Sequence, residues 1–304
     1  MKYSYYPGCS LESGAVEYDL SSREVLRLLG VELAEIPDWT CCGASAVEPV
    51  SRLLTLALPA RNLALAEREI PDTDMLVPCS ACYLNHLRVE RECGADRKLA
   101  ARVNEALSAE GLSRSGAVRV RHLLDVLSRD VGPERVGQAV VRRLEGLTVA
   151  PYYGCQVLRP YPLFDDPERP ASMEPLLRAL GVEILDWDMG GRCCGASLMA
   201  TKHEAALALV SAILDAASEA DLIVTVCPMC QMNLEAYQKE AIRSGGRGRP
   251  VSVLYLPQLM GLALGLSEDD VLLGKNMAVM DALRGKLHAP AAATVRGHGT
   301  PTGG

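Results

Sequence analysis

The sequence predicts an α/β protein built from two similar halves, each with its own parallel sheet. Three observations lead to this prediction. A set of five cysteines occurs twice along the 304 residues, in the same order and with nearly the same spacing. The residues that flank these cysteines also recur, and segments of strand character alternate with segments of helical character throughout. Such alternation is typical of parallel sheets covered by helices.

The repeat consists of a single cysteine, then a Cys-Cys-Gly sequence, then a Cys-x-x-Cys pair. Matching cysteines of the two copies lie 146, 152 and 148 residues apart, and only Cys93 stands outside the pattern. We therefore expect a tandem duplication with domains at 1–146 and 147–288, and a disordered tail rich in Gly, Pro, Thr and Ala at 289–304. The first copy comprises Cys9, Cys41, Cys42, Gly43, Cys79 and Cys82, and the second comprises Cys155, Cys193, Cys194, Gly195, Cys227 and Cys230.

Each half should open with a short strand, rich in Tyr or Val, that ends at the first cysteine. In the first half a helix, a strand and a long helix follow. In both halves a short β-rich run then leads directly into the Cys-x-x-Cys pair and another helix, and a last strand and helix close the half. The expected elements are helices 16–29 and 49–69 and strands 31–36, 75–77 and 118–120 in the first half, and helix 204–218 and strands 222–226 and 251–256 in the second.

Every cysteine of the repeat is expected just beyond the carboxyl end of a strand, where open parallel sheets bind their ligands. Each Cys-x-x-Cys and each Cys-Cys-Gly is also expected at a helix N-terminus. The free backbone N–H groups and the helix dipole there stabilise a thiolate-rich anion. Gly43 and Gly195 would remove a side chain where the backbone approaches that anion, which makes them candidate cofactor-binding residues.

Composition excludes several classes of protein. With 31 Lys and Arg against 38 Asp and Glu, the net charge is −7, and no basic block marks a nucleic-acid partner. No segment has the pattern of a secretory signal. The longest uncharged run, 250–267, is interpreted as a buried strand and a core helix rather than a membrane span. We therefore expect a cytoplasmic protein with reduced thiols and no membrane span of its own.

Three kinds of cysteine site remain open. A redox dithiol would use one Cys-x-x-Cys pair and leave the other three cysteines of each half idle. A structural zinc ion takes four ligands, whereas each half offers five, two of them adjacent. Adjacent side chains on an extended chain point in opposite directions, so they reach two atoms of a multi-iron cluster more easily than one ion. An iron–sulfur cluster uses all five thiolates and is the favoured interpretation, with zinc as the alternative for one half.

Any electrons would have to arrive through partner subunits. The sequence has no ferredoxin-type run of four cysteines, no G-x-G-x-x-G and no Walker loop. A symmetric duplication places two equivalent one-electron sites across a pseudo-twofold axis, and cleavage of a disulfide needs two electrons. Weaker candidates near the motifs are His86 and His203 for proton supply, and Arg192 and Lys202 for charge balance or contact with an anionic substrate.

With both copies in view, the chain resembles the B-type subunit of heterodisulfide reductase, a family defined by two cysteine-rich CCG domains. The resemblance rests on the pattern C-x₃₁-CCG-x₃₅-C-x₂-C and its second copy, and it covers about residues 1–265. It is especially close at 152–160, 166–170 and 227–230. It implies two Rossmann-like domains related by pseudo-twofold symmetry. It also implies two noncubane [4Fe–4S] clusters, each held by the five cysteines of one copy.

The activity that the resemblance implies is that of an oxidoreductase acting on a sulfur group. A small disulfide would be cleaved reductively between the two clusters. Its electrons would come from a C-like subunit with cubane [4Fe–4S] clusters and from a flavin-containing A-like subunit, and such partners could also hold the chain at a membrane. Gln156 and the stretch 196–200 depart from the methanogen pattern, so the disulfide is left open. The alternative is an electron-transfer subunit of another redox complex, linked to quinone, flavin or sulfur oxidation, without disulfide cleavage.

Overall fold

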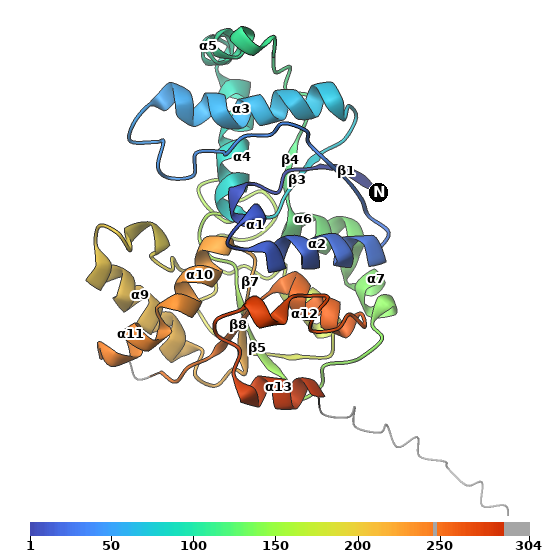
Figure 1. Ribbon diagram of the computed structural model, residues 1–304, viewed down its shortest axis with the longest axis vertical. Coiled ribbons are helices and arrows are strands. Elements are labelled where there is room, and N and C mark those ends of the chain that lie inside the picture. The colour runs from blue at the N-terminus through green and yellow to red at the C-terminus, as the bar shows by residue number, and fades with distance from the viewer. Residues whose placement is uncertain (246–247, 289–304) are drawn as a thin grey trace, which may run out of the picture.

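The chain folds into two α/β halves, each with a four-stranded sheet. The computed structural model describes residues 1–245 and 248–288, so the expected disordered tail at 289–304 lies outside the described residues. All strand pairs are parallel. The first half forms the upper part of the molecule in Figure 1 and the second half the lower part. The predicted fold class and duplicated architecture are confirmed.

The two sheets have the same topology, with strand orders β2-β1-β3-β4 and β6-β5-β7-β8. In each sheet the first strand lies between the second and the third. The chain therefore adds its second strand on one side of the first strand and its later strands on the other side. The crevice at such a switch point is the usual ligand site of an open sheet. The strands are β1 (Lys2–Tyr5), β2 (Glu32–Glu35), β3 (Met75–Val77), β4 (Val120–His122), β5 (Thr148–Tyr152), β6 (Glu183–Ile184), β7 (Leu222–Thr225) and β8 (Ser252–Tyr255).

The helices agree closely with those predicted. The long helix α3 (Arg52–Glu69) begins three residues later than expected, because the Ser51 hydroxyl caps it by accepting the Leu54 N–H at 3.3 Å. The other helices are α1 (Cys9–Glu12), α2 (Val16–Leu28), α4 (Ser80–Ala95), α5 (Arg97–Leu107), α6 (Leu123–Asp125), the π-helical η2 (Val126–Val131), α7 (Gly132–Ala139), α8 (Glu174–Ala179), α9 (His203–Ala216), α10 (Pro228–Ala236), α11 (Gln238–Arg243), α12 (Leu256–Ala263) and α13 (Asp281–His288), with 3-10 turns η1 (Ser108–Glu110), η3 (Ala196–Leu198) and η4 (Leu273–Lys275).

The long uncharged run forms core structure, as the sequence predicts. Its first part is the buried strand β8, and its second part is α12, in which every residue is buried. Among the helices of the described residues, none combines the length and the apolar composition that crossing a membrane requires.

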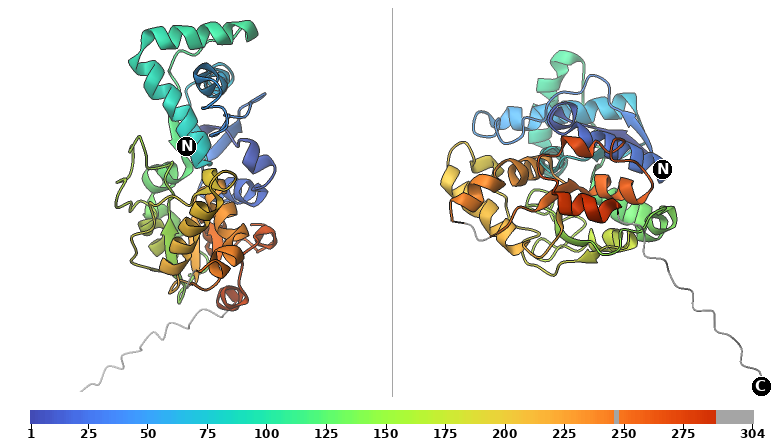
Figure 2. Two further views of the ribbon diagram at one scale, coloured as in Figure 1. Left: turned by 90° about the vertical axis from the view of Figure 1, so that its left-hand side faces the viewer. Right: turned by 60° about the horizontal axis from the view of Figure 1, so that its bottom comes forward.

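Helices of each half pack against helices of the other half. Helix α12 of the second half packs against α2 of the first, and the η2–α7 segment of the first half packs against α8 of the second. Figure 2 shows these elements lying where the two parts of the molecule meet. The proposed boundary at residue 146 separates the two sheets, but each half completes its packing on the other.

A tyrosine from the first half bridges the two halves at the centre of this contact. The ring of Tyr18 stacks on that of Tyr255 with 4.2 Å between centroids and 3° between planes. The Tyr18 hydroxyl lies 3.0 Å from the carbonyl oxygen of Pro78 and 3.1 Å from that of Val226. Pro78 and Val226 directly precede the two Cys-x-x-Cys pairs. One side chain therefore fixes the starts of both motifs relative to each other.

Two buried carboxyl groups lie close to this contact, one from each half. Glu17 is 6% exposed and Glu235 is 9% exposed. Burial and, to a smaller extent, the nearby charge of Glu17 raise the pKa of Glu235 to about 7, against the opposing effect of a hydrogen bond from the Ala278 N–H. Glu235 therefore binds a proton in the folded state at pH values where the unfolded chain has released it.

We expect Glu235→Gln to stabilise the protein at pH 8 and to change little at pH 4. The folded-state pKa lies above the unfolded value of 4.5, so the native state binds more protons between pH 4.5 and 7 and the free energy of unfolding falls as pH rises through that window. The shift corresponds to about 3 kcal/mol. Urea unfolding of wild type and variant between pH 4 and pH 8 measures this difference in the free energy of unfolding. Parallel pH profiles for the two proteins would contradict the prediction.

Candidate functional site

The ten cysteines of the repeat gather at the carboxyl edges of the two sheets in two groups. The single cysteines follow β1 and β5, the Cys-Cys-Gly sequences follow β2 and β6, and the Cys-x-x-Cys pairs follow β3 and β7. All ten are free thiols. The first cysteine group is Cys9, Cys41, Cys42, Cys79 and Cys82, and the second cysteine group is Cys155, Cys193, Cys194, Cys227 and Cys230.

In the first cysteine group, the adjacent cysteines contact different partners. The sulfur of Cys41 lies 3.7 Å from that of Cys9, and both of these residues are exposed. The sulfur of Cys42 lies 3.3 Å from that of Cys82, and both of these are buried, as is Cys79. The group therefore extends from the core to the surface.

The second cysteine group repeats this arrangement. Cys193 is exposed and hydrogen-bonds to the half-buried Cys155, which matches Cys41 and Cys9. The sulfur of Cys194 lies 3.6 Å from that of Cys230, and both are buried, which matches Cys42 and Cys82. Among the described residues, no set of three or more His, Cys, Asp or Glu side chains is arranged to hold a single metal ion.

Within the hydrogen-bonded thiols of these groups, one partner is shifted toward the thiolate form and the other away from it. A hydrogen bond with Cys155, helped by the backbone N–H of Gly195, lowers the pKa of Cys193 to about 6. A hydrogen bond with Cys230, helped by backbone N–H groups of α10, lowers the pKa of Cys227 to about 7. Hydrogen bonds with Cys41 and Cys82 lower the pKa of Cys42. Hydrogen bonds within the same groups raise the pKa of the partner thiols Cys41, Cys82, Cys155 and Cys230. The number and convergence of the thiols are what suit an iron–sulfur cluster, which binds cysteines as thiolates.

The expected helix N-termini are present at the Cys-x-x-Cys pairs but not at the first Cys-Cys-Gly. Cys79 and Cys227 are the N-cap residues of α4 and α10. The first Cys-Cys-Gly lies in a loop well before α3, so that prediction is wrong, and the second is followed only by the short turn η3. The reason is the left-handed backbone of Gly43 (φ 84°) and Gly195 (φ 79°), which does not continue into an α-helix.

Both of these glycines nevertheless contact sulfur through their backbone. The N–H of Gly43 donates to the sulfur of Cys41 at 3.4 Å, and the N–H of Gly195 donates to that of Cys193 at 3.4 Å. A Cβ at Gly195 would lie 3.0 Å from the Cα of Ala206 in α9. The missing side chain therefore makes room for packing within the second half. The role of both glycines in cofactor binding stays a prediction.

Two other glycines face the thiols directly, and the sequence did not lead us to predict them. A Cβ at Gly8 would lie 3.0 Å from the sulfur of Cys82, and a Cβ at Gly154 would lie 2.9 Å from that of Cys230. Both have left-handed backbone conformations. The available signal was the glycine that precedes the first cysteine in each copy.

Two asparagines hold the Cys-Cys-Gly loops and were also missed. The amide of Asn85 donates to the carbonyl of Cys42 at 3.2 Å, and that of Asn233 donates to the carbonyl of Cys194 at 2.7 Å. Each asparagine lies three residues after its Cys-x-x-Cys pair, and the two are 148 residues apart, like those pairs. The pattern C-x-x-C-x-x-N was therefore readable as part of the repeat.

Two tyrosines hold the same loops from the strand side. The hydroxyl of Tyr6 donates to the carbonyl of Thr40 at 2.8 Å, and that of Tyr152 donates to the carbonyl of Arg192 at 2.7 Å. Thr40 and Arg192 directly precede the two Cys-Cys-Gly sequences. Burial, followed by the charges of the neighbouring thiols, raises the pKa of both tyrosines, so they remain neutral donors.

A pocket of 50 Å³ opens at the second cysteine group. All five cysteines of the group line it, together with Ser80 from the first half and with Tyr153 and Met229. Tyr153 also lines a groove of 1020 Å³. Its wall carries three arginines and four carboxyl side chains: Arg169, Arg178, Arg192, Glu168, Glu174, Asp186 and Asp188. Tyr153 is therefore shared by the linings of the pocket and the groove.

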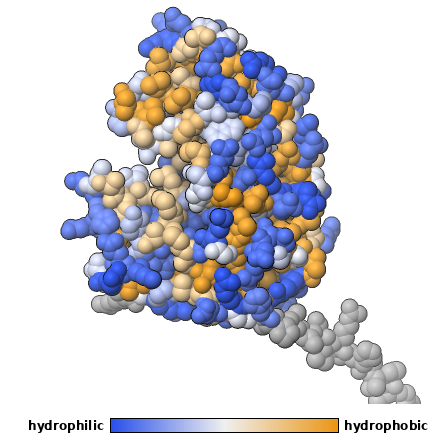
Figure 3. Space-filling view, viewed as in Figure 1, coloured by the Kyte–Doolittle hydropathy of each residue, from blue (hydrophilic) through white to orange (hydrophobic). Residues whose placement is uncertain are grey.

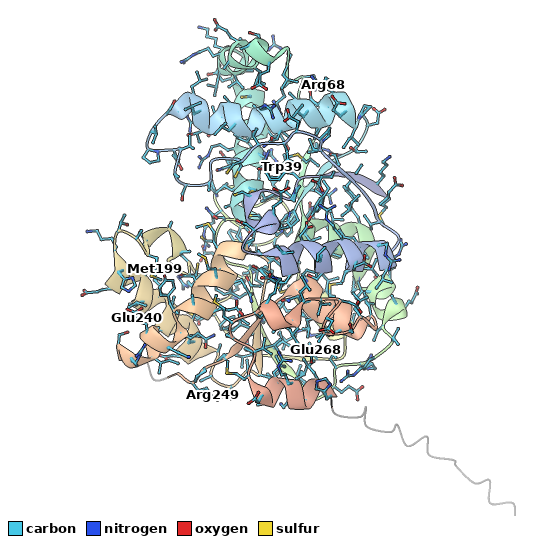
Figure 4. The ribbon with its side chains drawn as sticks, in the orientation of Figure 1. Trp39, Arg68, Met199, Glu240, Arg249 and Glu268 are labelled. Carbon is cyan, nitrogen blue, oxygen red and sulfur yellow. The ribbon has the colours of Figure 1, made fainter. Side chains whose placement is uncertain are left out.

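The surface is also notched between the part formed by α3 and the part formed by α9 and α10, as the space-filling view shows (Figure 3). Two labelled side chains from the cysteine loops lie in different parts of the molecule (Figure 4). Trp39, which precedes the first Cys-Cys-Gly, lies in the upper part, and Met199, which follows the second, lies beside α9 in the lower part.

The histidines near the motifs lie apart from this pocket. His86 is buried, and its Nδ1 lies 2.7 Å from the carbonyl oxygen of Cys82. His203 is exposed and pairs with Glu240 at 3.0 Å. Of the four weaker candidates from the sequence, His86, His203, Arg192 and Lys202, only Arg192 lines the pocket or the groove.

Two relatives match over nearly the whole chain. The "8-methylmenaquinol:fumarate reductase membrane anchor subunit" of Wolinella succinogenes is 37% identical over 93% of this chain and 98% of its own length. A protein of Archaeoglobus profundus, whose name describes it as like the B-type subunit of heterodisulfide reductase, is 30% identical over 89% of this chain and 93% of its own. Both names belong to components of redox proteins.

A solved structure confirms the fold. A hypothetical protein from Helicobacter pylori superimposes with a TM-score of 0.72 at 15% identity over 92% of this chain, which spans about half, 52%, of that protein's chain. The model of the cysteine-rich domain CCG matches residues 3–86 and 149–235, which hold the two cysteine groups. The chain therefore belongs to the family of CCG cysteine-rich domain proteins, with one copy of the domain in each half.

Proposed function

We propose that the chain is the iron–sulfur catalytic subunit of a heterodisulfide reductase-like complex, with one cluster in each cysteine group. The pocket at the second cysteine group carries the proposal, because five thiols converge on one small space. The fit is supported by the backbone N–H groups that donate to sulfur. Each cluster would be a noncubane [4Fe–4S] group that supplies single electrons when bound.

The arrangement suits reductive cleavage of a disulfide. Such a step breaks one S–S bond, consumes two electrons and two protons, and releases two thiols. Tyr18 fixes the starts of both Cys-x-x-Cys pairs, so a substrate placed near the second group would also lie near the first. The groove that shares Tyr153 with the pocket has room for the remainder of the substrate, and its wall carries side chains of both charges.

The partners follow from the same proposal. No dinucleotide-binding or ferredoxin-type motif is visible in the sequence, so the electrons would come from subunits that carry cubane [4Fe–4S] clusters and a flavin. Reduced thiols suit the cytoplasmic side of a membrane, where partner subunits could hold the chain.

A second candidate function is electron transfer linked to a quinol, without a disulfide. The 37% identity to a subunit named for 8-methylmenaquinol and fumarate favours it. In that case both cysteine groups would still hold clusters, but the pocket would not take a disulfide.

Anaerobic reconstitution with iron and sulfide tests the proposal. We expect a brown protein with iron and acid-labile sulfide in equal amounts and two electron paramagnetic resonance signals. One zinc per half without sulfide would contradict both candidates. A small disulfide should change a signal and be reduced by an artificial donor. A response to a quinone analogue but to no disulfide would instead support the second candidate.

A further inference from the structure

The two Cys-Cys-Gly loops share one sequence but not one backbone conformation. Both continue as Cys-Cys-Gly-Ala-Ser, at 41–45 and at 193–197. In the first copy Ala44 has a left-handed backbone with a φ of 42°, a conformation that residues with a side chain rarely adopt. In the second copy the equivalent residue, Ala196, begins the 3-10 turn η3. The difference therefore comes from the surroundings of each loop and not from its own five residues.

The left-handed backbone of Ala44 directs its N–H toward a buried thiol. This N–H donates to the sulfur of Cys42 at 3.4 Å, and Cys42 is 2% exposed. Its counterpart Cys194 is similarly buried, but within the described part of the chain no N–H group donates to the Cys194 sulfur. The exposed cysteine of each loop, in contrast, accepts from the glycine N–H at 3.4 Å in both copies. The asymmetry is therefore confined to the buried cysteine of each loop.

Asn85, in α4, holds this conformation of the first loop. Its amide donates to the carbonyl of Ala44 at 3.0 Å and to that of Cys42 at 3.2 Å, and its Nδ2 also lies 3.7 Å from the sulfur of Cys42. These two carbonyls belong to the peptide groups on either side of the one that carries the Ala44 N–H. The counterpart Asn233 donates to the carbonyl of Cys194 at 2.7 Å, and among the described residues no bond joins it to Ala196.

We propose that Asn85 is a positioning residue that raises the reduction potential of the cluster in the first cysteine group, by holding Ala44 so that its N–H donates to the Cys42 sulfur. The inference rests on the proposed function, since it requires a cluster at that group. Reduction by one electron adds negative charge to the cluster and its thiolate sulfurs, and an N–H that donates to a ligand sulfur stabilises this charge. The buried setting strengthens the bond, because the local dielectric is low.

A redox titration of Asn85→Leu, with dithionite as the electron source and electron paramagnetic resonance as the readout, tests the inference. The signal that Cys194→Ala retains identifies the first cluster. Leucine is similar to asparagine in size and has no donor. We expect reduction of the first cluster to become about tenfold less favourable, a shift of about 59 mV to more negative potential. The second signal should keep its potential.

Asn233→Leu is the matched control. It removes the equivalent amide of the second half, whose bond to the Cys194 carbonyl does not direct an N–H toward the Cys194 sulfur. We expect the potential of the second cluster to move far less than that of the first cluster moves in Asn85→Leu. Equal shifts in the two variants would overturn the inference, because the amides would then act only by holding their loops.

Substitutions of Ala44 provide an independent measurement if Asn85→Leu does not assemble its first cluster. Ala44→Gly keeps the N–H and adopts a left-handed backbone without strain, so it should keep the potential of the first cluster. Ala44→Val disfavours that backbone, because valine is β-branched, and should shift the potential in the same direction as Asn85→Leu. The side chain of Ala44 is partly exposed, which leaves room for the larger residue.

Three results separate failure of the inference from failure of the proposed function. An unchanged first potential in Asn85→Leu, or in Ala44→Val where the asparagine variant lacks the cluster, would overturn the inference and leave the proposed function standing. Loss of the first cluster from both variants would also overturn it, because the loop would then serve assembly rather than potential. Absence of any cluster from the wild-type protein would overturn the proposed function itself.

Discussion

Cys194→Ala should lose the cluster of the second cysteine group and retain that of the first. Cys194 is 4% exposed and its sulfur contacts that of Cys230 at 3.6 Å, so alanine removes a thiol from the buried part of the group. We expect half of the wild-type iron and sulfide, one remaining electron paramagnetic resonance signal, and no disulfide turnover. We expect no turnover because cleavage of the disulfide needs two electrons, and the remaining cluster supplies only one.

Cys93→Ala is the matched control for this experiment. Cys93 is also buried, at 6% exposed, but it lies in α4 outside both cysteine groups. We expect it to retain full iron content and both signals. Full turnover by Cys194→Ala would contradict the proposed two-cluster mechanism.

Gly154→Ala should prevent assembly of the second cluster by displacing a thiol. A Cβ at this position would lie 2.9 Å from the sulfur of Cys230, and the backbone has a φ of 71°. The left-handed conformation alone costs alanine about 1–2 kcal/mol. The displaced sulfur adds a local effect on the cluster, measured as lost iron and a lost signal after reconstitution.

Gly146→Ala separates these two effects. Gly146 has a similar φ of 80°, but a Cβ there would meet no atom within 4 Å. This control should show the stability loss in urea unfolding and still assemble both clusters. If Gly146→Ala lost as much iron as Gly154→Ala, backbone strain would explain the result and contact with sulfur would not.

Most of the architecture was predictable because the relevant signals are local or repeated. The helix over Val16–Leu28 and the strand over Leu222–Thr225 have clear hydrophobic patterns, and their bounds differ by a residue from those predicted. The cysteines were found by spacing, and their convergence at the strand ends follows from parallel topology. That they bind clusters stays a prediction.

What the sequence could not show depends on contacts between distant segments. Nothing local indicates that Tyr18 reaches the carbonyls of Pro78 and Val226, or that Ser80 belongs to the site of the other half. The first Cys-Cys-Gly was predicted at a helix start because no local pattern reveals the left-handed φ of Gly43. The contact between the Gly154 backbone and a sulfur of the distant Cys-x-x-Cys pair was hidden for the same reason.

The exchanged packing of α12 on α2 and of η2–α7 on α8 has an evolutionary consequence. A single half would leave the partner face of its own helices uncovered, so an unduplicated ancestor would have buried that face in a symmetric homodimer. In a homodimer every substitution appears on both sides of the axis. In a single chain that holds both copies this constraint is absent, and one side carries His122 where its counterpart carries Tyr255.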